Sequence, residues 1–412
     1  MAYRYDGGTL SCDGVPLSDI AEAAGTPCYV YSAGDIVSRY CAYDNAFGDL
    51  PHQVCYAVKA NSNLSILALL AREGAGFDIV SGGELFRVLR AGGHPSKIVF
   101  SGVGKTRAEM EYALNENIRA FNCESEGEIE LLNELAGLRN TKARIAVRVN
   151  PDVDAATHPY ISTGLSDHKF GIDISEVEAV YARANRLPNI SVEGVSCHIG
   201  SQILDAGPMM DAVDKMVALV ERLRSAGIAI RHLDLGGGLG VPYRPAEEAP
   251  EIGAVVAGIR ERVAGRDLEV MVEPGRSIVG EAGVLVTRVL YRKRSAKKEF
   301  LVVDAAMNDL IRPALYKSYH DIRPVASKNG RELITVDVVG PVCETGDFLA
   351  RARDMEALEC GELLAIFTAG AYGFVQSSNY NSRPRAVETL VEGGEWRVIR
   401  ARETYDDLVR GE

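Results

Sequence analysis

The sequence predicts an α/β protein in which a (β/α)₈ barrel is followed by an antiparallel β domain. Over residues 33–280, eight short apolar segments alternate with longer amphipathic ones, and eight strand–helix units over about 250 residues are typical of such a barrel. After residue 280 the strand-like segments follow one another without long helices. We therefore expect a barrel at 33–280 and a β domain at 281–412, which the strand-like residues 1–32 join.

The barrel strands are expected at residues 53–59, 76–80, 97–101, 118–123, 143–150, 192–199, 232–235 and 269–273. The β domain strands are expected at residues 283–291, 300–303, 332–339, 363–368, 386–391 and 396–401. Several barrel segments end in glycine or in a reactive side chain. Because barrel enzymes assemble their active sites at the carboxyl ends of the strands, we expect these residues to share one site.

Composition excludes several classes of partner. The chain has 412 residues, 47% of them hydrophobic and 25% charged, and its net charge of -12 argues against binding to nucleic acid or to an anionic membrane surface. The eight cysteines are scattered without zinc-site spacing, which indicates free thiols in a reducing compartment. There is no signal-peptide core and no apolar run long enough for a membrane helix, so we expect a cytoplasmic protein.

The segment 54–62, with the sequence VCYAVKANS, ends its apolar run in one lysine, Lys59. Burial lowers the pKa of a lysine because the charged form loses its hydration, and a neutral amine can attack a carbonyl to form a Schiff base. On this segment alone, a lysine that closes a strand and points to solvent is the commoner alternative.

Two turns after the last barrel strands suggest a phosphate-bearing cofactor. The sequence LGGGLG at 235–240 offers backbone N–H groups to an anion, although a flexible turn explains it about as well. The sequence VEPGR at 272–276 adds the carboxylate of Glu273 and the fixed charge of Arg276. A carboxylate for a ring nitrogen, a glycine nest and a lysine together describe a site for pyridoxal phosphate.

Three further segments carry candidate side chains. His198, in HIGSQ, is either a core residue or stacks on the cofactor ring, and Ser201 follows it as a phosphate ligand. Cys343 lies in a Gly/Pro-rich loop beside Glu344, a poor place for a core residue and a good one for a proton donor. Tyr372, between glycines, is either a ligand contact or a hairpin aromatic.

The order of these segments resembles that of the alanine-racemase-type barrel decarboxylases, a fold type III family that uses pyridoxal phosphate. Within this group the chain is most similar to the diaminopimelate decarboxylases, and the resemblance runs over nearly the whole chain. The closer match rests on the stretches 158–164 (HPYISTG), 169–172 (KFGI), 307–316 (MNDLIRPALY) and 378–385 (SNYNSRPR). One departure is Thr345, where the family is expected to have serine.

The resemblance implies a role for each candidate residue. Lys59 forms the Schiff base, His198 stacks on the ring and Glu273 pairs with the ring nitrogen. The implied phosphate and cofactor contacts are Ser201, Gly236, Gly237, Gly238, Gly275, Arg276 and Tyr372. Cys343 reprotonates the reacting carbon, and the implied substrate contacts are Arg276, Arg312, Tyr316, Glu344 and Tyr372. The family also implies a homodimer in which Cys343 and Glu344 come from the partner subunit.

The implied reaction is the decarboxylation of meso-diaminopimelate to L-lysine, the last step of bacterial lysine synthesis. Two arginines suit a distal carboxylate and would repel a lone distal ammonium, so decarboxylation of carboxynorspermidine or of another basic amino acid is the second candidate. A racemase would need a tyrosine base where this chain has Cys343 and Glu344. A non-catalytic regulator would be expected to have lost Lys59 or Cys343, and this chain has both.

Overall fold

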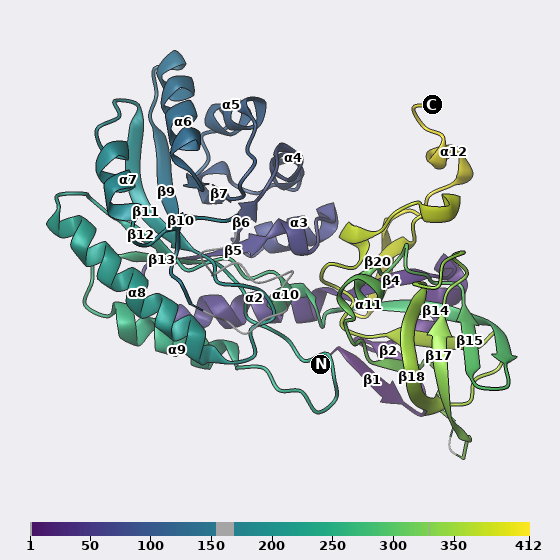
Figure 1. The fold of residues 1–412 in the computed structure, drawn as a ribbon. Helices are drawn as coiled ribbons and strands as arrows, with labels where there is room; N and C mark the ends of the chain where they lie inside the picture. The colour runs from purple at the N-terminus through teal and green to yellow at the C-terminus, as the bar shows by residue number, and fades with distance from the viewer. Residues whose placement is uncertain (1, 154–168, 329) are drawn as a thin grey trace. The chain divides into compact units, whose positions relative to one another are not determined.

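The computed structural model describes residues 2–153, 169–328 and 330–412, and Figure 1 shows its fold. The chain divides into two compact units. The barrel unit consists of Arg39–Val241 and Glu248–Ser277, and the β unit consists of Met1–Ser38, Pro242–Glu247 and Ile278–Glu412. The stretch 158–164, which supports the family resemblance, lies outside the described residues.

The barrel unit contains a closed ring of eight parallel strands. Its strands are β5 (His52–Ala57), β6 (Gly76–Ile79), β7 (Ile98–Phe100), β8 (Ala120–Cys123), β9 (Ala143–Asn150), β11 (Ile190–Cys197), β12 (His232–Asp234) and β13 (Glu269–Val272). Each pairs with the next, and β13 pairs with β5 to close the ring. All eight predicted strands are confirmed to within a few residues at each end, and the barrel prediction is correct. A short extra strand, β10 (Ile172–Asp173), pairs with β9.

Local sequence signals end each strand and start the next helix. The side chains of Ser81, Thr106 and Ser125 accept a backbone N–H in the first turn of the helix that follows each of them. The helices of this unit lie outside the strands in Figure 1. They are α3 (Leu64–Arg72), α4 (Gly82–Arg90), α5 (Arg107–Asn115), α6 (Glu126–Leu138), α7 (Val177–Ala184), α8 (Ala206–Ser225) and α9 (Ile252–Val263), with short η1 (Val58–Ala60) and η2 (Pro95–Lys97). The division between units falls within α2 (Ala33–Phe47) and α10 (Arg276–Val279).

The β unit contains a mixed sheet rather than a purely antiparallel one, and a separate antiparallel sheet formed by β1, β2 and β3. Its strands are β1 (Tyr3–Asp6), β2 (Thr9–Cys12), β3 (Val15–Pro16), β4 (Cys28–Ser32), β14 (Gly283–Arg294), β15 (Glu299–Val303), β16 (Ile322–Pro324), β17 (Leu333–Val339), β18 (Phe348–Glu356), β19 (Leu363–Ile366), β20 (Val387–Glu392) and β21 (Glu395–Arg400). Most pairs are antiparallel, but β15 pairs with β17 and β4 with β20 in parallel. The N-terminal strand β4 lies between β14 and β20, so the expectation that the N-terminal segment joins this sheet is confirmed.

Sequence reasoning did not predict β16 or β18. Strand β18 reads FLARARDME, and its charged residues hide the apolar alternation from sequence. The helices of this unit are short: α1 (Leu17–Ala24), α11 (Arg312–Tyr316), α12 (Tyr405–Leu408), η3 (Phe374–Gln376) and η4 (Tyr380–Ser382). In the part of the chain that the structure describes, no helix combines the length and the apolar character needed to cross a membrane.

Candidate active site

The carboxyl ends of the barrel strands surround a cavity of about 430 Å³. Three of the predicted residues line it: Lys59 after β5, His198 after β11 and Glu273 after β13. The same cavity is lined by Ser101, which was expected as a strand-end residue, and by Asn122, Arg148 and Phe170, which were not predicted. The expectation that strand ends share one site is confirmed for these residues, because a closed parallel ring places all its carboxyl ends on one rim.

Lys59 lies one turn beyond β5, in η1, with its side chain 35% exposed. Its Nζ donates a hydrogen bond to Oδ2 of Asp78 at 2.5 Å. Asp78 is fully buried in β6, and its Oδ1 contacts no hydrogen-bond partner within the described residues. Burying a carboxylate is costly unless it is paired. An aspartate inside an apolar strand segment therefore indicates a functional or paired group, and this signal in the sequence could have identified Asp78.

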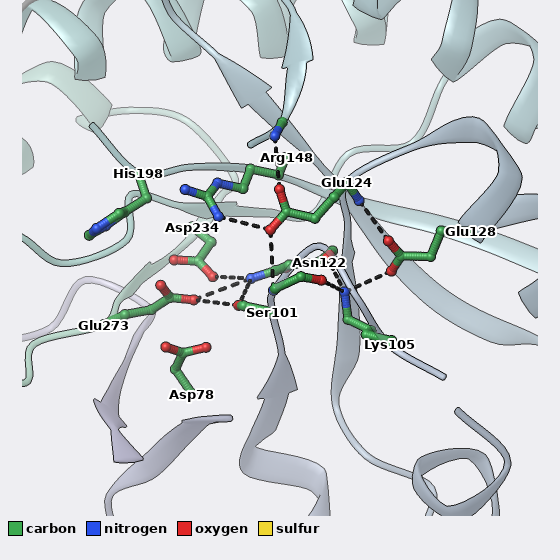
Figure 2. A network of polar contacts seen from close by, with 12 residues as sticks. Asp78, Ser101, Lys105, Asn122, Glu124, Glu128, Arg148, His198, Asp234 and Glu273 are labelled. Atoms are coloured by element: carbon green, nitrogen blue, oxygen red, sulfur yellow. Dashed lines mark hydrogen bonds and ion pairs between the residues drawn. The ribbon is translucent and has the colours of Figure 1, made fainter. Parts of the chain in front are cut away.

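Glu273 belongs to a buried group of polar side chains (Figure 2). The side-chain amide of Asn122 lies 3.2 Å from Oε1 of Glu273 and 3.0 Å from Oδ2 of Asp234. Ser101 Oγ donates to Glu273 at 3.3 Å, and the N–H of Gly236 donates to Oδ1 of Asp234 at 2.9 Å. The contacts join the ends of two early strands, at Ser101 and Asn122, to Asp234 and Glu273 on strands that follow 112 to 172 residues later.

Burial sets the protonation of this site. It raises the pKa of Glu273 well above its usual value, and the negative charges of Asp234 and Asp78 add to the effect. Burial also raises the pKa of Asp234. The pKa of His198 is lowered well below its usual value by burial and then by the positive charges of Arg148 and Lys59. His198 is therefore neutral near pH 7.

The hydrogen bond to His198 assigns its tautomer. The N–H of Gly237 donates to Nδ1 at 3.2 Å, so the ring proton lies on Nε2. A neutral, oriented imidazole at the cavity wall has the character that stacking on a cofactor ring requires.

The predicted phosphate residues are packed closely. A Cβ on Gly237 would lie 2.1 Å from the backbone oxygen of Glu273, and Gly238 has a φ of +116. These positions therefore require glycine. Arg276 is buried and donates to Ser201 Oγ at 2.9 Å, which brings the predicted arginine and serine together. Gly275 lies against Ala57 and Ala60, on either side of Lys59.

The remaining predicted residues lie in the β unit. Cys343 is exposed, and its backbone N–H donates to Oδ1 of Asn381 at 2.9 Å. Asp347 holds the same loop by accepting the N–H groups of Val342 and Met307, each at 2.7 Å. The geometry of this loop therefore depends on Asp347, which the sequence places close to Cys343, and on Asn381, which was not predicted as a site residue.

The predicted substrate contacts Arg312 and Tyr316 lie together. Arg312 is buried in α11, and its guanidinium lies 5.2 Å from the ring centre of Tyr243 and 5.6 Å from that of Tyr316. Tyr372 is half-buried with a φ of 55, a strained value for a residue other than glycine. Glu344 is exposed and adjacent to Cys343.

Comparison with known proteins agrees with this geometry. Residues 33–280 match the family model "Pyridoxal-dependent decarboxylase, pyridoxal binding domain". A diaminopimelate decarboxylase of Pseudomonas aeruginosa is 57% identical over 410 residues, covering 100% of this chain and 98% of the relative. The chain belongs to the diaminopimelate decarboxylase family. A second relative with the same name, from Pseudomonas fluorescens, is 55% identical and covers 100% of this chain and 98% of the relative.

A solved member of the family has the same fold. The crystal structure of diaminopimelate decarboxylase from Helicobacter pylori complexed with L-lysine has a TM-score of 0.92 and 43% identity, covering 96% of this chain and 98% of that one. The likeness spans both units, and the cofactor of the family is pyridoxal phosphate.

A second network of buried polar side chains supports the carboxyl-end rim of the barrel. Lys105 Nζ donates to Glu128 at 2.7 Å and to the backbone oxygens of Gly102 and Asn122, each at 2.8 Å (Figure 2). Glu124 pairs with Arg148 at 2.8 Å. Sequence reasoning missed these residues because their partners lie on other strands and loops.

Replacing Lys105 with methionine should lower the free energy of unfolding by about 3–5 kcal/mol, because Glu128 would keep a buried charge without its partner. Denaturant titration measures this. Arg107→Met removes an exposed pair with Glu134 and should leave the midpoint unchanged. Equal midpoints for Lys105→Met and the parent would contradict the prediction.

Proposed function

We propose that the chain decarboxylates meso-diaminopimelate to L-lysine, the last step of lysine biosynthesis, with pyridoxal phosphate bound in the barrel cavity. The observation that carries this proposal is the placement of the Lys59 amine and the Glu273 carboxyl in one cavity of about 430 Å³. We also propose that the protein is cytoplasmic, as its sequence predicts.

The residues of the cavity fit the cofactor. The acceptor Oδ1 of Asp78 is buried without a hydrogen-bond partner in the described residues, beside the Lys59 amine, which can hold an aldehyde covalently. The neutral imidazole of His198 suits the ring face, and Glu273 suits the ring nitrogen. Gly236, Gly237, Gly238, Gly275, Ser201 and Arg276 would hold the phosphate. When bound, pyridoxal phosphate supplies the electron sink for the electrons that the departing carboxylate leaves behind.

Side chains of the protein would bind the substrate and transfer the protons. Lys59 would hold the cofactor through its amine, and Glu273 would keep a proton at the ring nitrogen. Cys343 delivers a proton to the reacting carbon from its exposed loop, and Tyr372 contacts both cofactor and substrate. The stacking of Arg312 on Tyr316 supports its role toward the distal carboxylate, with Arg276 and with Glu344 on the distal ammonium.

Substrate choice can be tested directly. The purified chain with pyridoxal phosphate is offered meso-diaminopimelate, carboxynorspermidine, ornithine, arginine and lysine in parallel, and carbon dioxide release is measured. We expect release from diaminopimelate to exceed the others by about 100-fold or more, because diaminopimelate alone among them offers a distal carboxylate to Arg276 and Arg312. Faster release from carboxynorspermidine or ornithine would overturn the substrate proposal and keep the reaction class.

We also propose that the active site is shared across a homodimer, with Cys343 and Glu344 supplied by the partner subunit. Lys59→Ala and Cys343→Ala subunits should each be inactive alone. After mixing, about one quarter of the parent activity should return, because half of the dimers are mixed and each has one intact site. Mixed dimers that are seen by native mass spectrometry and show no activity would contradict the shared site.

A further inference from the structure

We propose that Asp234 and Asn122 are positioning residues that hold Glu273 as the protonated half of a buried carboxyl pair, ready for the ring nitrogen of the cofactor. The proposal rests on the proposed function for the identity of that cofactor. It assigns a role to two side chains that neither the sequence nor the family resemblance selected.

The geometry joins the two carboxyl groups through one amide. Asn122 Nδ2 lies 3.0 Å from Asp234 Oδ2 and 3.2 Å from Glu273 Oε1, so both carboxyls share the same donor. Figure 2 shows the two carboxyls side by side with Asn122 between them and the rest of the network. Asp234 and Asn122 are 1% and 3% exposed, and water therefore cannot replace these contacts easily.

The bridging amide is itself fixed. Asn122 lies in β8, and its backbone oxygen accepts from Lys105 Nζ at 2.8 Å. Lys105 is anchored by Glu128. The side-chain amide of Asn122 also lies 3.1 Å from Ser101 Oγ, which donates to Glu273. Asn122 can therefore orient Glu273 without adjusting its own position.

The charges decide which carboxyl carries a proton. The ionisable groups that face Glu273 are Asp234 at the end of β12, Asp78 in β6 and Lys59 after β5, and Lys59 is directly paired with Asp78. Two neighbouring buried carboxyls cannot both ionise cheaply. Each carboxyl accepts from two donors, but Asp234 is the better stabilised anion, because its contacts with the N–H of Gly236 and the Asn122 amide are 2.9 and 3.0 Å long. The contacts of Glu273 with Ser101 Oγ and the Asn122 amide are longer, at 3.3 and 3.2 Å. The raised pKa of Glu273 agrees with this assignment.

The consequence concerns the first contact with the cofactor. The O–H bond of Glu273 breaks and an N–H bond forms at the ring nitrogen, which leaves Glu273 with one negative charge and the nitrogen with one positive charge. The new ion pair then offsets the burial of the Glu273 carboxylate. Asp234 would keep its own charge throughout.

Infrared spectroscopy of the full chain stripped of cofactor tests this near neutral pH. The parent should show the carbonyl stretch of protonated Glu273 as a band in the difference spectrum of parent minus Glu273→Gln. The difference is needed because burial also raises the pKa values of Glu84 and Asp309 to about 7, and these carboxyls contribute to both spectra. Adding pyridoxal phosphate to the parent should remove the band. Asp234→Asn should weaken or abolish the band, because the remaining carboxyl no longer faces a second negative charge there. Asp214→Asn, which changes an exposed carboxylate on α8, should leave it unchanged.

Two outcomes would overturn the proposal: a difference spectrum of parent minus Glu273→Gln that lacks the band, or a band that is unaffected by Asp234→Asn. Should Asp234→Asn fail to fold, Asn122→Ser removes the bridge and keeps both carboxyls. It should shift the band and weaken pyridoxal phosphate binding by about tenfold, because a hydrogen bond to a charged group is lost. An unchanged band would again contradict the proposal. Failure of the chain to decarboxylate any amino acid would leave these results untouched, so the two failures are distinguishable.

Discussion

Replacing Lys59 with alanine should lower decarboxylation by about 10³-fold or more and abolish covalent attachment of pyridoxal phosphate. The physical reason is the position of the Lys59 amine. Lys59 presents its amine at the carboxyl-end cavity, where its Nζ donates to Asp78 at 2.5 Å. Borohydride treatment followed by peptide mass analysis measures the attachment, which should fall on the peptide that contains Lys59.

An exposed lysine of the same unit provides the control. Lys142 precedes β9 and is exposed, and Lys142→Ala should keep both the attachment and the activity. If Lys59→Ala retained the visible absorbance that borohydride removes from the parent, the assignment of Lys59 would be wrong.

Replacing Cys343 with alanine should lower kcat by about 10²- to 10⁴-fold and leave cofactor binding intact, because only the final proton delivery loses its donor. The thiol is exposed, and its loop is held by the hydrogen bond from the Cys343 N–H to Asn381. Steady-state kinetics with meso-diaminopimelate separates kcat from KM, and the visible spectrum reports the bound cofactor.

Cys360 is the matched control, since it is the other exposed cysteine of this chain. Cys360→Ala should keep the parent kcat. Unimpaired lysine formation by Cys343→Ala would exclude the proton-donor role, and a loss of cofactor absorbance would indicate a structural defect instead.

Much of the fold could be predicted because its signals are local. Parallel strands buried on both faces read as apolar runs, and β9 (Ala143–Asn150) was predicted to the residue. The N-terminal strand β4 was expected in the C-terminal sheet, but its parallel pairing with β20 was not. Pairing direction depends on which strands become neighbours, and no local pattern specifies that. Strand β18 was missed because charged residues dominate its sequence.

The candidate site also contains residues that could be predicted from the sequence and residues that could not. Lys59, His198 and Glu273 were found because reactive residues at strand ends are visible in sequence, and all three line the cavity. The roles of the predicted residues stay predictions until the variants are measured. Asp78 and Asn122 were missed, since each lies inside a strand that was interpreted only as core.

The sequence by itself determined that eight strands alternate with helices and that a lysine, a histidine and a carboxylate follow three of those strands. Only the tertiary structure decided which partners these side chains have. Asn122 meets Asp234 and Glu273 across 112 and 151 residues because ring closure brings their strand ends together. The protonation of Glu273 follows from the same closure, because burial beside Asp234 and Asp78 exists only in the folded barrel.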